Sequence, residues 1–325
     1  MIIKQTYTTP TPLSEFLSIT SFSQDLPSIF SVRHKTEYRY SLPVSHSKHL
    51  FRLQPEHDMS QSVLNYKLTC SVQKAEVCNF TGAFGNNASF LEIKEPYREF
   101  TILSEAIVSV SQLPKNLDLL HQPRTMPLIW MPWDRIMMQA YLQAPELPEA
   151  ELFALAEYAM SFVGKNNHDV FEVLKDINET IYREFTYASG STTLFTTPYE
   201  VFIHRRGVCQ DFANLFICLA RLLGVAARYR VGYIYTGGNY ANKIQSDASH
   251  AWVEVFLPYL GWIGFDPTNG CMAEKNHIRV ASGRNFMDAT PTSGTIFEAE
   301  EGVQETLVTS VEVVSLLPEE GTKAV

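Results

Sequence analysis

The segment of residues 206–216 reads Arg206-Gly207-Val208-Cys209-Gln210-Asp211-Phe212-Ala213-Asn214-Leu215-Phe216. It is typical of a glycine turn that leads into an amphipathic helix, because apolar residues recur at steps of three and four after Phe212 and Gly224 supplies a stop. Cys209 lies in the first turn, on the protein side, where the positive end of the helix dipole favours a thiolate. An arbitrary cysteine is more often a small buried hydrophobe, so the partners of Cys209 decide between the two interpretations.

The composition is that of an ordinary globular protein of about two domains. The chain has 325 residues, 45% of them hydrophobic, and its 26 basic and 35 acidic residues give a formal charge of −9. We find no run of Lys or Arg, so neither nucleic acid nor a membrane surface is expected as a partner. Five cysteines without Cys-x-x-Cys spacing and no apolar segment of signal-peptide or membrane-spanning length predict a reduced, cytoplasmic protein.

The first part of the chain is rich in β patterns. Residues 1–29 carry prolines, serines and threonines with weak periodicity and predict a mobile leader. Residues 30–112 contain alternating runs of β-branched and aromatic residues separated by Pro, Gly and Asn, which predict an antiparallel β domain. Residues 113–147 are rich in proline and predict an extended linker.

The second part, residues 148–316, mixes helical and strand periodicity and predicts an α+β domain around the Cys209 helix. The segment between Phe185 and Cys209 is polar and predicts a loop beside that helix. Residues 311–316 alternate like a strand, so we expect the C-terminal part of this domain to pair with a sheet, before a tail at 317–325. The other expected elements are helices at residues 148–162 and 169–184 and strands at residues 225–235, 250–257 and 262–266.

The register of the last two predicted strands decides whether His250 and Asp266 meet. With a four-residue hairpin loop, the two side chains lie on opposite faces of the sheet. With a three-residue loop, Trp252 faces Asp266, and the carboxylate becomes a diagonal neighbour of His250 at about 7–8 Å between β-carbons. His250 and Asp266 can therefore form a functional pair only if the strand pairing places both side chains on one face of the sheet, as the three-residue loop does, or if a bulge shifts the register.

A thiol at a helix start, a histidine on a strand and an aspartate on the next strand have the composition of a Cys-His-Asp relay. Cys209 would attack an acyl carbon, His250 would hold and return the proton, and Asp266 would fix the tautomer of the ring. The plainer interpretation is a structural cysteine, a histidine satisfied by other hydrogen bonds and a turn-capping aspartate. We expect no metal, and because no phosphate-binding glycine motif or His-Glu-x-x-His is found, no cofactor.

Four motifs around these residues resemble the bacterial transglutaminase-like cysteine peptidase family. The resemblance implies a papain-like transglutaminase core behind a bacterial-type N-terminal β domain, with Cys209, His250 and Asp266 as nucleophile, base and orienting acid. Asn214 and Asn285 stand where the family pattern has His and Asp, which puts substrate contacts in doubt. The motifs that carry the resemblance are Gly207-Val208-Cys209-Gln210-Asp211-Phe212-Ala213, Ala227-Arg228-Tyr229 to Gly232-Tyr233, Ser249-His250-Ala251-Trp252-Val253-Glu254-Val255, and Gly261-Trp262-Ile263-Gly264-Phe265-Asp266-Pro267-Thr268-Asn269-Gly270, within a similarity that covers about residues 30–316.

The expected function is thiol-dependent acyl chemistry on peptide or isopeptide amides through a thioester, and the resemblance favours hydrolysis. Transfer to an amine, as in a transglutaminase, and a non-catalytic peptide-binding module stay open, since the shape of the cleft decides whether water or an amine reaches the thioester. The backbone N–H of Cys209 is the expected oxyanion donor. Tyr187, Gln210 and Trp252 are candidate substrate-binding or oxyanion side chains, and the oligomeric state is left open.

Overall fold

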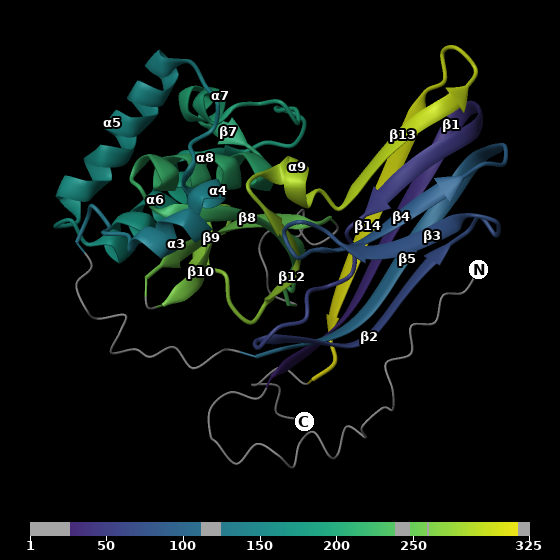
Figure 1. Ribbon diagram of the computed structural model, residues 1–325, viewed down its shortest axis with the longest axis horizontal. Helices are drawn as coiled ribbons and strands as arrows, with labels where there is room; N and C mark the ends of the chain where they lie inside the picture. Colours follow the sequence, from purple (N-terminus) through teal and green to yellow (C-terminus); the bar gives the residue numbers. More distant parts are fainter. Residues whose placement is uncertain (1–26, 112–124, 238–247, 259, 318–325) are drawn as a thin grey trace.

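The computed structural model describes residues 27–111, 125–237, 248–258 and 260–317. Most of the predicted leader, the first part of the predicted linker and nearly all of the predicted tail lie outside the described residues. Within the described residues, the protein is α+β, as predicted: a tall antiparallel sheet stands beside a unit of helices packed on a smaller sheet (Figure 1). No helix in these ranges is long and apolar enough to cross a bilayer.

The N-terminal unit is built around one long strand of 24 residues, β1 (Ser28–Phe51). Pro43 lies at the register shift between Arg39 and Val44, where a residue without an N–H can be accommodated in a strand. The sheet order is β2-β5-β1-β4-β3. The partner strands are β2 (Gln61–Cys70), β3 (Glu76–Thr81), β4 (Asn87–Ile93) and β5 (Tyr97–Val110).

The two last strands, β13 (Thr292–Ala299) and β14 (Glu305–Ser315), pair with β1 and not with the second sheet. A strand near the C-terminus is therefore present, but the predicted boundary that placed residues up to 316 in the second domain is wrong. The physical reason is the length of β1: its two halves each need a partner on the side away from β5 and β4, and β14 and β13 supply one for each half.

The predicted extended linker also needs correction, because its described part contains two short helices. These are α3 (Pro132–Met137) and α4 (Gln139–Leu142), and Pro132 opens the first of them, where its missing N–H costs nothing. Just before them, Nε1 of Trp130 donates to the carbonyl of Gly224 at 2.9 Å, and its ring stacks on Phe256. The segment is thus attached to the second unit by specific contacts.

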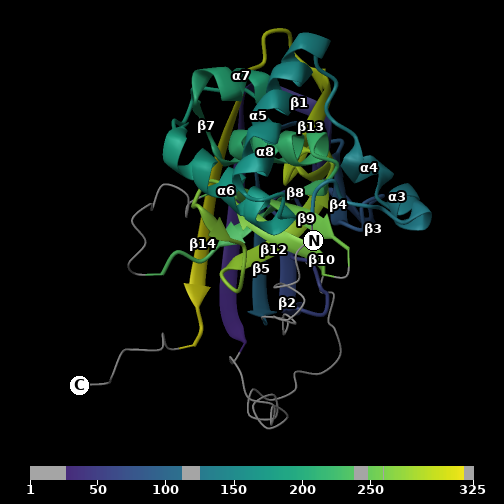
Figure 2. The ribbon, with the colours of Figure 1, turned by 90° about the vertical axis from the view of Figure 1, so that its left-hand side faces the viewer.

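The second unit places helices on one face of a five-stranded antiparallel sheet with the order β11-β10-β9-β8-β12. Figure 1 shows this sheet between the helices and the N-terminal sheet, and in Figure 2, turned by 90°, the helices lie in front. A short parallel pair, β6 with β7, lies beside the start of α8. The elements are α5 (Glu149–Lys165), α6 (Val170–Glu184), β6 (Thr186–Tyr187), α7 (Pro198–His204), β7 (Arg206–Gly207), α8 (Cys209–Leu222), β8 (Ala226–Ile234), β9 (His250–Leu257), β10 (Gly261–Asp266), β11 (Cys271–Met272), β12 (His277–Gly283) and α9 (Phe286–Ala289).

Helix α8 is the centre of this unit and is buried on nearly all sides, more than its amphipathic pattern predicts. Helices α5, α6 and α7 pack on it from one side and strands β8 and β9 from the other. Arg221 is buried and donates to the carbonyls of Ala227 and Arg284. Gly224 follows the helix with a φ of +74°, which confirms its predicted role as the stop.

Helix α7 interrupts the loop that was predicted between Phe185 and Cys209. Thr197 and Glu200 form a capping box around its first turn, with Pro198 at the first helical position. The sequence Thr-Pro-Tyr-Glu was therefore a helix-start signal that the loop prediction missed. The helix returns the chain to Arg205 and so fixes the approach to Cys209.

The two units share one apolar core and specific polar contacts. Phe30 of β1 packs in the same buried cluster as the apolar residues of α8. Nδ1 of His34 lies 2.9 Å from the hydroxyl of Tyr233, and Asn86 Nδ2 donates to the carbonyl of Ser282 at 2.7 Å. The N-terminal sheet therefore supports the back of the smaller sheet that carries His250 and Asp266.

Candidate active site

Cys209 begins α8 directly after a turn that is held by Asp211. The carboxylate of Asp211 accepts from the backbone N–H of Val208 at 2.8 Å and from the hydroxyl of Thr192 at 2.6 Å. A β-carbon on Gly207 would lie 2.8 Å from that of Asp211, so only glycine fits beside this carboxylate. Burial raises the pKa of Asp211, although both hydrogen bonds oppose the rise. The half-buried Cys209 is thus fixed at the helix start, and Asp211 is a supporting residue that the sequence analysis did not single out.

His250 and Asp266 meet on one face of the smaller sheet. Leu257 pairs with Gly261 and Val253 with Phe265, which is the register of the three-residue loop. Nε2 of His250 lies 2.8 Å from Oδ2 of Asp266. The predicted contact between the two side chains is therefore confirmed, and the register is the one that places both of them on the same face of the sheet.

The electrostatics of this pair favour an imidazolium beside a carboxylate. Both side chains are fully buried, and burial alone would disfavour each charge. The attraction of the Asp266 carboxylate outweighs burial and raises the pKa of His250 to about 10. Burial likewise opposes the ionisation of Asp266, but the attraction and hydrogen bond of His250 hold the pKa of that carboxyl well below its usual range.

The Cys209 thiol lies near the same imidazole and further raises its pKa. Because Nε2 is taken by Asp266, Nδ1 is the ring nitrogen left for the sulfur. Nδ1 is buried and has no hydrogen-bond partner among the described residues. The sulfur therefore approaches the ring without completing the bond, a common condition of catalytic contacts before substrate binds.

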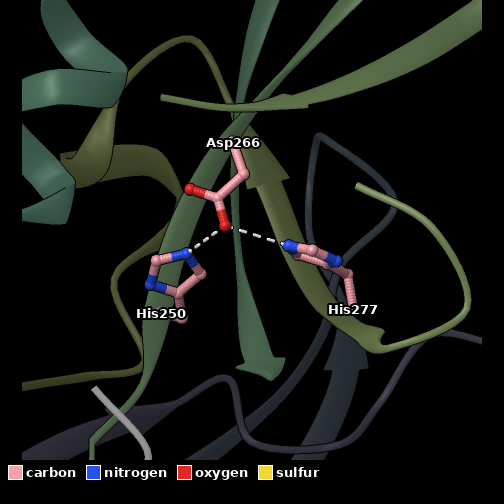
Figure 3. A group of neighbouring side chains, drawn as sticks. All are labelled: His250, Asp266 and His277. Atoms are coloured by element: carbon pink, nitrogen blue, oxygen red, sulfur yellow. Dashed lines mark hydrogen bonds and ion pairs between the residues drawn. The ribbon is translucent and has the colours of Figure 1, made fainter. Parts of the chain in front are cut away.

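Asp266 is held by more donors than His250 alone. Its Oδ1 accepts from the backbone N–H groups of Thr268 and Asn269 at 3.0 and 3.2 Å, and its Oδ2 accepts from Asn269 Nδ2 at 2.7 Å. Nε2 of His277, the first residue of β12, lies 3.0 Å from Oδ2. Figure 3 shows the rings of His250 and His277 on opposite sides of this carboxylate. The carboxylate is thereby fixed from several directions.

His277 was not predicted as a site residue, because no strand was predicted there and its contact depends on the pairing of β12 with β8. The ligand atoms of His250, Asp266 and His277 all lie within 4.8 Å of one another, a spacing that a metal ion can also bridge. Here the nitrogens are hydrogen-bonded to the carboxylate at 2.8 and 3.0 Å. The three side chains therefore form a hydrogen-bonded cluster.

The three candidate substrate or oxyanion side chains lie in different surroundings. Tyr187 pairs with Gly207, beside the start of α8, and burial together with the nearby Cys209 raises its pKa to about 12. Gln210 is half-buried in the first turn. Trp252 is only 1% exposed and packs against the rings of His250 and His277, so the structure corrects its assignment: it supports the histidines and offers no surface to a substrate.

Two family profiles match the chain. The one described as "Transglutaminase-like superfamily" matches residues 156–267, and the one described as "Bacterial transglutaminase-like N-terminal region" matches residues 30–109. The first range contains the start of α8 and the β9–β10 hairpin. The second coincides with the strands β1 to β5, which the sequence assigns to the N-terminal β domain.

Similar proteins extend the match over most of the chain. An uncharacterized protein of Mycobacterium tuberculosis is 35% identical over 290 residues, which span 84% of this chain and 88% of the relative. A protein-glutamine gamma-glutamyltransferase of Pseudomonas aeruginosa is 31% identical over 148 residues, 44% of this chain but only 19% of that enzyme.

Among solved structures, the crystal structure of a candidate cysteine protease from Cytophaga hutchinsonii shares the fold. It has a TM-score of 0.72 at 24% identity and covers 91% of this chain and 93% of its own. With both family profiles and a long relative in agreement, the chain belongs to the transglutaminase-like superfamily, in the form that carries a bacterial transglutaminase-like N-terminal region.

Proposed function

We propose that this protein performs thiol-dependent acyl chemistry on peptide or isopeptide amide bonds, with Cys209 as nucleophile, His250 as base and acid, and Asp266 as orienting carboxylate. The observation that carries the proposal is the buried 2.8 Å contact between His250 and Asp266, with the thiol at a helix start against the same ring. A buried imidazole kept cationic by a carboxylate is a suitable partner for a thiolate.

Each of these residues has its own role in the reaction. Cys209 Sγ attacks the amide carbon, and the oxygen that becomes negative is met by the backbone N–H of Cys209, since the first N–H groups of a helix lack partners within it. Gln210, in the first turn of α8, and Tyr187, which pairs with Gly207 just before it, are further donor candidates. His250 gives its proton to the leaving amine, and the acyl group stays on sulfur as a thioester.

The thioester is then released by water, so that the overall reaction is hydrolysis. After the amine leaves, His250 is neutral at Nδ1 and takes a proton from water as the water attacks the thioester. The carboxylic acid product and the free thiol complete the cycle. The proposed substrate is a peptide or protein amide, without nucleic acid or membrane partners, in the cytoplasm.

Transfer of the acyl group to an amine is the second candidate. It is favoured by the similarity of part of this chain to the glutamyltransferase of P. aeruginosa, although the matched part is a small share of that enzyme. Both candidates share the thioester. They differ only in whether water or an amine reaches it.

Product analysis separates these functions. The protein is incubated with a peptide library that contains glutamine and isopeptide bonds, with and without methylamine, and the products are identified by mass spectrometry. We expect new carboxylic acids in both conditions; methylamides would favour transfer. The matched control is Cys209→Ala, which should give no product while its circular dichroism spectrum stays unchanged. Peptide binding without any product would favour a non-catalytic module, and equal products from both proteins would contradict the proposed nucleophile.

A further inference from the structure

A second histidine, His277, binds the same carboxylate oxygen as His250. Its side chain is 6% exposed, and its Nε2 lies 3.0 Å from Asp266 Oδ2. That oxygen also accepts from Nε2 of His250 at 2.8 Å and from Nδ2 of Asn269 at 2.7 Å. Three donors therefore converge on the atom that orients the candidate catalytic base.

The turn that precedes β12 sets the tautomer of His277. The backbone N–H of Glu274 donates to Nδ1 of His277 at 3.3 Å, and the backbone N–H of His277 donates back to the carbonyl of Glu274 at 2.9 Å. A nitrogen that accepts a hydrogen bond carries no proton, so the proton of this ring lies on Nε2 and points to Asp266. His277 is thus a neutral donor whose direction is fixed by the backbone.

Packing fixes the same ring. Trp252 meets His277 edge to face, with ring centroids 5.2 Å apart, and lies nearly parallel to His250 at 6.1 Å. Gly232 leaves room for this indole, since a β-carbon there would come within 2.7 Å of it. The two histidines are therefore held at a set separation, with Asp266 between their Nε2 atoms (Figure 3).

We propose that His277 is a positioning residue for the acyl chemistry: its Nε2–H fixes the Asp266 oxygen that binds His250 and takes up part of the charge of that oxygen. The inference rests on the proposed function, because it assigns His277 a role in the same site. His277 acts through Asp266 and not on the substrate. As a neutral ring, it adds a donor to the buried carboxylate without adding a second positive charge.

The N–H of His277 should lower the pKa of His250. Among the described residues, the titratable groups that face His250 are Asp266 on β10, Cys209 on α8 and His277 on β12. The positive end of the His277 N–H weakens the attraction of the carboxylate for the proton on His250. Without that N–H, the remaining donors still hold the carboxylate, so the pKa of His250 rises and its proton passes to the leaving amine more slowly.

The first test needs no variant. In protein with 15N-labelled histidine, the ring of His277 should show a protonated Nε2 and an unprotonated Nδ1, as the hydrogen bond from Glu274 N–H to Nδ1 requires. A proton on Nδ1, alone or together with Nε2, would overturn the proposal, since the ring would then lack the fixed neutral donor.

The second test compares two variants of His277. His277→Phe keeps an aromatic ring against Trp252 but removes the donor, whereas His277→Gln keeps a neutral N–H near the position of Nε2. We expect His277→Phe to raise the pKa of His250 by about 0.5 to 1, measured by NMR titration, and to lower turnover about three- to tenfold. Alkylation of Cys209 by iodoacetamide should stay at or above the wild-type rate, because it requires the thiolate but not the acid. His277→Gln should remain within about twofold of wild type in both rates.

A buried histidine outside the site provides the matched control. His49 of β1 is 2% exposed and packs among aromatic rings, as His277 does. His49→Phe should leave turnover, alkylation and the titration of His250 unchanged. If turnover and alkylation fell together in His277→Phe, or if neither changed, the role of His277 would be structural only. An ordinary thiol reactivity in the wild type would instead contradict the proposed function, which keeps the two failures distinguishable.

Discussion

Two histidines of this protein are equally buried, but their pKa values are shifted in opposite directions. His34 in β1 and His250 in β9 are each 1% exposed. The partners of His34 are the hydroxyls of Tyr233 and Thr36, and burial lowers its pKa to about 4. The partner of His250 is a carboxylate, which raises its pKa to about 10 despite burial. The charge of the neighbour, and not burial, therefore decides whether a histidine is structural or chemically active here.

The largest effect should come from removing that charge. Asp266→Asn keeps the shape of the side chain, but it gives His250 a neutral partner such as His34 has. We expect the pKa of His250 to fall below 6.5 and turnover to fall about a hundredfold or more, with residual activity. NMR titration of the ring and a rate assay on peptide substrates measure the two effects.

The matched carboxylate for this prediction is Asp288, which pairs with Arg284 outside the site. Asp288→Asn should leave both measurements within about twofold of wild type. If Asp266→Asn left the titration of His250 unchanged, the carboxylate would not be the source of its high pKa.

The pH dependence of stability should separate the two histidines as well. His34 has a folded pKa of about 4 against 6.5 in the unfolded chain, so the unfolded state binds the proton first as pH falls. Its contribution is present above pH 6.5 and is lost between about pH 6.5 and 4, by up to about 3 kcal/mol. For His250 the sign is reversed: its contribution is present below pH 6.5 and is lost as pH rises towards 10.

Urea unfolding as a function of pH tests this difference. His34→Phe removes the titrating ring, so the decline in the free energy of unfolding between pH 6.5 and 4 should become shallower. An acid decline as steep as that of the wild type would show that His34 is not one of the groups responsible.

The smallest predicted effect on stability concerns β14, the strand that pairs with β1 beside His34. Val311 of β14 pairs with His34 of β1 and is 6% exposed, whereas Val308 on the same strand is 46% exposed. Val311→Ala should lower the free energy of unfolding by about 1–2 kcal/mol, and Val308→Ala by less than about 0.5. Equal effects of the two changes would contradict the placement of the C-terminal strand in the N-terminal sheet.

Local sequence patterns were enough to predict the parts of the site that depend on neighbouring residues. The start of α8 at Cys209 followed from a glycine turn and apolar periodicity, and the meeting of His250 with Asp266 was reduced to two hairpin registers. Both are local features, in which residues a few positions apart determine the geometry. The first sheet was likewise visible as alternating runs.

Features that depend on distant pairing were not predictable in this way. His277 reaches Asp266 only because β12 pairs with β8, and β14 joins β1 across most of the chain. Trp252 alternates correctly along β9, yet its burial depends on neighbouring strands, since Gly232 of β8 and His277 of β12 lie against its indole. An alternating pattern shows that a strand has two faces, but not which strand pairs with it or which face a second unit will cover.

The rate of Cys209 alkylation by iodoacetamide as a function of pH distinguishes a thiol that is activated by a cationic His250 from an ordinary thiol. We expect rapid alkylation of Cys209 well below pH 7 in the wild type, and we expect the pH dependence of the rate to move to higher pH in His250→Ala. Peptide mapping assigns the label to Cys209 among the five cysteines. A wild-type rate that followed a single ionisation near the ordinary thiol pKa of about 8.5, unchanged in His250→Ala, would contradict the account.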